Sequence, residues 1–201
     1  MAGRIAPRVT LYLRGASVPS VGDGEIALPQ LPPPSRGSAV FGDGSHATTR
    51  LCASAVDWLC RRRKPEAVLD VGTGTGILAR IARARGAGFV VGTDIDPVAL
   101  DSARAHAALD EKAGEIHFST ELPDRWGARF DLVVANILEE PLRRLAPFLA
   151  GAPRTGGVLL ISGFTRPQAP ALRLLYERLG LAFAGSSDLE EWTLLMFNNA
   201  D

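Results

Sequence analysis

The 201-residue chain has few of the residue types that bind metals or form disulfides. Its 3 histidines and 2 cysteines are scattered, and no His/Cys/Asp cluster has metal-ligand spacing. We therefore expect no bound metal. Cys52 and Cys60 fall in one expected helix over residues 48–63, about 12 Å apart along its axis. This exceeds the separation that a disulfide allows, so we expect two buried free thiols in a reducing compartment.

The chain also lacks an excess of either charge. Lys+Arg and Asp+Glu both number 22, so the formal net charge is zero and a general polyanion-binding surface is not expected. The one dense basic run, Arg61 to Lys64, is interpreted as the last turn of a helix, where cations complement the helix dipole and Pro65 prevents continuation. We therefore expect no direct binding of nucleic acid.

Long apolar runs are missing as well. No apolar run approaches the length of a transmembrane helix, and the N-terminal residues show no uninterrupted apolar segment before Arg14 that would suggest a signal peptide. The sequence therefore predicts a cytoplasmic protein that does not interact with a membrane.

What the chain does have is a regular alternation of strand and helix patterns. From residue 66 onward, short apolar runs alternate with segments of helical period, and the last two apolar runs have no helix between them. This pattern predicts an α/β fold with a seven-stranded, mostly parallel sheet and helices on both faces. The last two strands have a short link, so they pair antiparallel in a C-terminal hairpin. The expected strands are 67–71, 89–96, 115–119, 130–137, 156–164, 181–188 and 191–197.

Residues 1–40 have a different character. They contain a possible short strand "VTLYL", a turn "VGDGE" and a connector "LPQLPPPSRG" that is typical of extended, polyproline-like chain. With 201 residues, the chain has room for one domain with a full core. We therefore expect a proline-rich, partly extended N-terminal extension over 1–40 and a single catalytic domain over 41–201.

The stretch "LDVGTGTGIL" joins the first strand of this alternation to the next helix. Gly72, Gly74 and Gly76 allow a tight turn and close approach of the backbone to a ligand, and the helix N-terminus offers unpaired N–H groups. Asp94 lies at the end of the second strand, about twenty residues after this loop, where an acid can accept both hydroxyls of a ribose. The pattern predicts a nucleoside-type ligand; the alternative is a helix-capping turn and a solvated acid.

The glycine spacing is G-x-G-x-G, which is tighter than the G-x-G-x-x-G of dinucleotide sites, and Asp70 precedes it by two residues. This loop resembles that of the class I S-adenosylmethionine-dependent methyltransferases, whose Rossmann-like sandwich ends in an antiparallel hairpin. The resemblance implies a loop along the methionyl part of the cofactor, with Asp70 or its neighbours facing a cationic amino group. An NAD(P)-binding oxidoreductase is less favoured, because the chain has no room for a second, substrate domain.

Asn136 is expected at the carboxyl end of the fourth strand, on the same rim as the glycine loop. Its side-chain amide has an acceptor oxygen that would orient the lone pair of a target amine toward the methyl group of the cofactor. The alternative is an asparagine that caps the following helix. We identify Asn136 as the candidate catalytic residue.

Six segments in order resemble the catalytic domain of the PrmA family, the methyltransferases of bacterial large-subunit ribosomal protein eleven, over roughly residues 41–197. They are "FGDGSHATTRLC", "VLDVGTGTGILA", "GTDIDPVALDSARAHA", "DLVVANILEEPLRRLAP", "GGVLLISGF" and "EEWTLLMF". The resemblance implies that Thr49, Gly72, Asp94 and Asn136 contact S-adenosyl-L-methionine, whose product is S-adenosyl-L-homocysteine. It also implies methylation of lysine side chains or an α-amine of a protein such as a ribosomal protein. Since the family carries an N-terminal substrate-recognition domain that is not expected here, a small molecule or another protein is the alternative acceptor.

The stretch "FGDGSHATTR" then has an interpretation. Gly42 and Gly44 allow a sharp turn over the cofactor pocket, and Thr48 or Thr49 either caps the following helix or turns a hydroxyl toward the methionyl carboxylate. His46 either lines the methyl-transfer channel or serves the turn.

Four further positions have two interpretations each. Phe41 packs against cofactor or substrate, or in the core. Trp192 walls an apolar channel or packs in the core. Glu190 and Glu191 guide a cationic substrate or belong to a solvated hairpin.

Overall fold

A seven-stranded sheet forms the centre of the computed structural model, which describes residues 2–32, 40–110, 115–122 and 130–200. The strand order is β6-β5-β4-β7-β8-β10-β9, and every neighbouring pair is parallel except β10 with β8 and β10 with β9. The predicted α/β fold with a C-terminal antiparallel hairpin is therefore confirmed. The strands are β4 (Ala67–Val71), β5 (Phe89–Thr93), β6 (His117–Ser119), β7 (Phe130–Asn136), β8 (Pro153–Thr165), β9 (Ala182–Leu189) and β10 (Trp192–Asn198).

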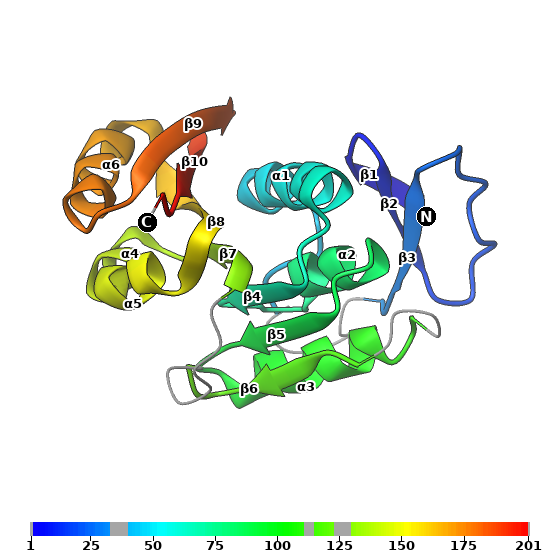
Figure 1. The fold of residues 1–201 in the computed structure, drawn as a ribbon. Helices are drawn as coiled ribbons and strands as arrows, with labels where there is room; N and C mark the ends of the chain where they lie inside the picture. The colour runs from blue at the N-terminus through cyan, green and yellow to red at the C-terminus, as the bar shows by residue number, and fades with distance from the viewer. Residues whose placement is uncertain (1, 33–39, 111–114, 123–129, 201) are drawn as a thin grey trace.

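Helices cover both faces of this sheet. Neighbouring residues of each strand point to opposite sides, and apolar residues on both sides need to be buried. Val68 of β4 packs in the hydrophobic cluster of α1 and α2, whereas Leu69 packs in the cluster of α4, α5 and α6. Figure 1 shows these two groups of helices on different sides of the molecule. The helices are α1 (Ala47–Arg63), α2 (Ile77–Ala84), α3 (Pro97–Ala107), α4 (Glu139–Arg144), α5 (Ala146–Gly151) and α6 (Ala169–Arg178), with a 3-10 turn η2 (Arg166–Gln168) before α6.

The helical pattern over 139–149 is interrupted, as its proline predicts. The chain forms α4 and α5 as separate short helices that meet at Leu145, and Pro147 lies in the first turn of α5. Proline has no N–H to donate and its ring clashes with the carbonyl four residues earlier, so one continuous helix is excluded.

The N-terminal residues form a second, three-stranded sheet of β1 (Ala2–Ala6), β2 (Val9–Leu13) and β3 (Ile26–Gln30). The strand at 9–13 was predicted correctly, but β1 and β3 were not. The reading of 28–37 as polyproline-like connector is wrong for Leu28–Gln30, which belong to β3; residues 33–37 lie outside the described residues. Pro29 fits because β3 is an edge strand, where a missing N–H breaks no bond of the ladder.

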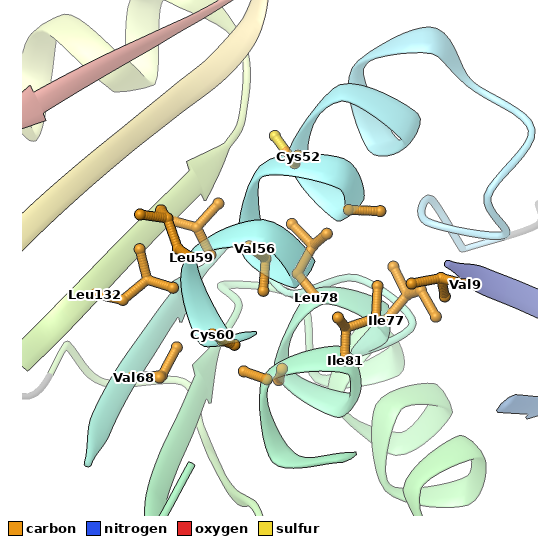
Figure 2. Close-up of a cluster of buried hydrophobic side chains, with 14 of the residues drawn as sticks. Val9, Cys52, Val56, Leu59, Cys60, Val68, Ile77, Leu78, Ile81 and Leu132 are labelled. Carbon is orange, nitrogen blue, oxygen red and sulfur yellow. The ribbon is translucent and has the colours of Figure 1, made fainter. Parts of the chain in front are cut away.

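This small sheet shares its core with the large domain. Ile5, Val9, Leu11 and Leu28 belong to the same buried cluster as the inner residues of α1 and α2, and Figure 2 shows Val9 next to Ile77. The small sheet is therefore packed against α1 and α2, the helices before and after the β4–glycine loop segment.

Two arginines of the α2 segment also hold the small sheet. The fully buried Arg80 pairs with Asp110 at 2.6 Å and donates to the Pro29 carbonyl at 2.5 Å. Arg85 pairs with Asp57 and donates to the Gly24 carbonyl at 3.0 Å. These bonds pair guanidinium groups that would otherwise be costly to bury, although Nη1 of Arg80 has no hydrogen-bond partner among the described residues.

Both cysteines are free and buried, in agreement with the sequence analysis. In the part of the chain that the structure describes, no helix has the length and apolar character needed to cross a bilayer. The same part holds no group of three or more His, Cys, Asp or Glu side chains arranged to bind a metal ion.

Candidate active site

A cleft of about 550 Å³ opens at the carboxyl ends of β4, β5 and β7. Val71, Thr93 and Asn136, the last residues of these three strands, all line it. Since β4 lies between β5 and β7 in the sheet, the loops that follow these strands meet at one edge. This is the position where ligands bind in parallel α/β sheets.

The predicted site residues divide into two groups. Gly72, Gly74, Asp94 and Asn136 line the cleft. Thr49, Asp70 and Gly76 are buried and are not among its lining residues.

The glycine loop has a backbone that only glycine adopts easily. Gly72, Gly74 and Gly76 have φ values of 72°, 55° and 77°. A Cβ on Gly74 would lie 2.3 Å from the Phe41 carbonyl oxygen, and one on Gly72 would lie 2.1 Å from Ile137 Cγ2. The loop therefore passes between segments 41–45 and 136–138, and it brings backbone into the cleft.

Asp94 follows β5 and is held by two backbone donors. Its Oδ2 accepts the Gly74 N–H at 3.0 Å and its Oδ1 accepts the Asp96 N–H at 3.1 Å. A carboxylate oxygen has two lone pairs, so each oxygen can accept one further hydrogen bond from the cleft. Asp94 is thus oriented to accept a pair of neighbouring hydroxyls.

Ile95, which the sequence analysis did not select, lies beside this acid. It lines the cleft, and it is 90% exposed. An apolar side chain in that position offers a surface for a flat ring. In the sequence, the only indication of this position is an isoleucine between two aspartates directly after a strand.

Asp70 supports the loop from below. Its side chain is completely buried, and Oδ2 accepts the Thr73 hydroxyl at 2.7 Å and the Ala79 N–H at 3.2 Å. Burial is the main reason why the pKa of Asp70 is raised to about 7; the charge of Asp94 adds to this rise, and the two hydrogen bonds oppose it. Asp70 joins the end of β4 to the first turn of α2 and so stabilises the loop between them.

The aromatic side of the cleft comes from distant parts of the chain. The ring of His46 makes edge-to-face contacts with Phe41 and Trp192, at centroid distances of 5.2 and 4.8 Å. All three residues line the cleft, and their roles toward cofactor or substrate remain predictions.

His46 also has the turn role, because it is the N-cap of α1. Its Nδ1 accepts the Thr48 N–H at 3.3 Å and lies 2.8 Å from Thr48 Oγ1. Of the two alternatives for Thr48 and Thr49, the helix cap is therefore wrong, and a hydroxyl turned toward the methionyl carboxylate remains a prediction. Thr48 lines the cleft, whereas Thr49 is buried behind it, and its hydroxyl has no hydrogen-bond partner among the described residues.

Asn136 ends β7 with its side chain in the cleft. The residue is 8% exposed, and its Oδ1 is buried without a hydrogen-bond partner in the described part of the chain. The residue that caps α4 is Leu138 and not Asn136, so the helix-capping alternative does not explain this asparagine. A buried acceptor without a partner costs free energy, so Asn136 remains a candidate for a contact with a ligand.

Gly163 of β8 is a second position that the sequence analysis missed. It lines the cleft with φ of 100°, and a Cβ there would lie 2.1 Å from the Ile137 carbonyl oxygen. A glycine in the interior of a strand signals such a close approach of backbone.

A glycine turn after β4, an acid after β5 and a polar side chain after β7, in a sheet of this strand order, define the class I methyltransferase fold. A crystal structure of ribosomal protein L11 methylase from Lactobacillus delbrueckii subsp. bulgaricus aligns with a TM-score of 0.84 at 27% identity, over 98% of this chain and 97% of that one. Coverage this complete includes the small N-terminal sheet.

The chain belongs to the PrmA family: the model "Ribosomal protein L11 methyltransferase (PrmA)" matches residues 36–200. Relatives named ribosomal protein L11 methyltransferase include one from Methylobacillus flagellatus, 46% identical over 68% of this chain and 45% of its own length. Another, from Thiobacillus denitrificans, is 45% identical over 78% of this chain and 51% of its own. The family resemblance is thus confirmed, and the chain spans about half the length of the curated relatives it matches.

Proposed function

We propose that this chain is an S-adenosylmethionine-dependent methyltransferase that methylates lysine side chains or an α-amine of a protein. The names of its relatives support ribosomal protein L11 as that protein. The observation that carries the proposal is the buried, unpartnered amide oxygen of Asn136 in the same cleft as the glycine loop and Asp94.

The residues of the cleft fit the parts of this cofactor. Asp94 can accept the two ribose hydroxyls, and Ile95 offers an apolar surface to the adenine ring. The N-terminus of α1, with no acidic residue in its first turn and Thr48 facing the cleft, suits a carboxylate.

The chain would promote transfer mainly by orienting the amine. When bound, S-adenosylmethionine would supply a methyl group on a sulfonium sulfur, with a neutral thioether as the leaving group for an attacking amine. Asn136 would accept an N–H of the neutral amine and so direct its lone pair. Alignment of this kind contributes about 7–11 kcal/mol when the geometry is near attack.

The amine must be neutral before it reacts. For a lysine at pH 7 the loss of the proton costs about 4–5 kcal/mol, from its reference pKa near 10.4. The rings of Phe41 and Trp192 provide weakly polar walls, and desolvation against such walls disfavours the ammonium form.

The test is transfer of labelled methyl from S-adenosylmethionine to purified ribosomal protein L11, with mass spectrometry of the modified residues. Asp94→Ala should abolish binding of S-adenosylhomocysteine in calorimetry, and NAD(H) should give no heat with any variant. Asn136→Ala should keep this binding but lower turnover about a hundredfold, the usual order for one lost transition-state contact.

Asn199→Ala is the matched control. Asn199 donates its amide to the Pro153 carbonyl at the start of β8, away from the cleft. Its turnover should equal that of the wild type. If the wild type binds S-adenosylhomocysteine but L11 remains unlabelled, L11 is rejected as the substrate. If Asn136→Ala transfers methyl at the wild-type rate, the role of that residue is rejected.

A further inference from the structure

The turn at residues 41–45 is attached to the glycine loop by Thr75. The Thr75 hydroxyl donates to the Gly42 carbonyl at 2.6 Å, and its N–H donates to the Phe41 carbonyl at 3.0 Å. Thr75 is 5% exposed, and it is not one of the described residues that line the cleft. Its single hydroxyl proton is used inside the protein, so this side chain acts on the turn and not on a ligand.

The small N-terminal sheet holds the same turn from the other side. Gln30, the last residue of β3, donates its side-chain N–H to the Asp43 carbonyl at 3.0 Å. A Cβ on Gly44 would lie 2.7 Å from side-chain atoms of both Ile5 and Leu11. The turn is therefore closely packed between the small sheet and the glycine loop.

The glycine loop does not depend on this turn for its own position. The N–H groups of Gly72 and Thr73 donate to the Thr93 carbonyl at 2.8 and 2.9 Å, and Gly74 donates to Asp94. These bonds remain when the Thr75 hydroxyl is removed, so we expect the change to affect the turn more than the loop.

Phe41 starts this turn and His46 follows it, and both side chains line the acceptor side of the cleft against Trp192. We infer that Thr75 is a positioning residue: through its bonds to Phe41 and Gly42, it sets the aromatic wall against which the acceptor amine is aligned. The inference rests on the proposed function and adds to it a residue that sets the geometry for the acceptor without touching it.

The test compares Thr75→Val, which keeps the shape and removes the hydroxyl, with Thr75→Ser, which keeps the hydroxyl. Thr75→Val should lower kcat/KM for the protein acceptor about tenfold, the scale of one lost buried hydrogen bond. Its Kd for S-adenosylhomocysteine, measured by calorimetry, should stay within about threefold of the wild type, because other bonds hold the loop. Thr75→Ser should restore kcat/KM.

Ser54→Ala is the control for loss of a hydroxyl-to-carbonyl bond elsewhere. Ser54 donates to the Arg50 carbonyl on an exposed part of α1, and its removal should change neither quantity. The inference is overturned if Thr75→Val keeps the wild-type kcat/KM, if Thr75→Ser loses as much, or if cofactor affinity falls as far as kcat/KM. An inactive wild type would instead contradict the proposed function, and the inference with it.

Gln30→Ala tests the same turn from the small sheet if Thr75→Val does not fold. Gln30 is at the protein surface, so its removal leaves the core intact. The expected result is again a lower kcat/KM for the acceptor with an unchanged Kd for S-adenosylhomocysteine. An unchanged kcat/KM overturns the inference.

Discussion

The buried ion pair between Arg80 and Asp110 gives a sharp prediction about stability. The Arg80 side chain is 0% exposed and the Asp110 side chain 5%, with Nε–Oδ2 and Nη2–Oδ1 distances of 2.6 and 3.0 Å. Asp110→Asn preserves the shape but leaves the guanidinium charge buried without a counter-ion. Removal of one partner from such a pair costs about 3–5 kcal/mol. For a domain of this size the loss corresponds to a fall of about 6–20 °C in Tm.

Thermal unfolding followed by circular dichroism, with urea unfolding in parallel, measures this change. Arg104 and Asp101 provide the matched control, because they form the same kind of pair at 3.0 Å while their side chains are 52% and 79% exposed. Asp101→Asn should leave Tm within about 2 °C, since exposed pairs contribute little. If the two variants shift Tm equally, burial is not what makes the Arg80 pair important, and the reasoning fails.

Two further predictions concern buried titratable groups. Burial raises the pKa of Asp70 to about 7, so between about pH 4 and pH 7 the folded chain binds more protons than the unfolded chain and its unfolding free energy falls as pH rises. Asp70→Asn should flatten this dependence in urea unfolding across that window, and an unaltered slope would contradict the assignment. Burial also raises the pKa of the Cys52 and Cys60 thiols, so both should react with a thiol reagent only when urea unfolds the chain. Rapid labelling of either thiol in native buffer would show that the region around α1 opens readily.

The core of the fold from residue 66 onward could be predicted because its signals are local. Alternate residues of β4, such as Val68 and Leu69, enter opposite clusters, as a strand with both faces buried requires. Pro147 marks the break between α4 and α5 within two residues. The hairpin of β9 and β10 follows from a link too short for a parallel crossover.

The N-terminal strands were harder to predict, because their stability depends on distant partners. Nothing in the local composition of β3 distinguishes an edge strand with Pro29 from an extended connector. Leu28–Gln30 form a strand because they pair with β2 and because the Pro29 carbonyl accepts a hydrogen bond from Arg80 of α2. The N-cap of α1 could not be predicted for a related reason: the His46 ring is also packed against Phe41 and Trp192, which are contacts that the local sequence does not show.

The glycine loop, the acid near the end of the second strand and the asparagine at the end of the fourth could be predicted from local patterns, because each depends on backbone conformation over a few neighbouring residues. Which of these candidates reach the cleft depends on contacts between distant segments. Asp70 and Thr49 turned out to lie behind it, while Phe41 and Trp192, from opposite ends of the chain, meet on His46. The physical reason is that the direction of a side chain is set by packing against segments remote in sequence, and such contacts leave no local pattern.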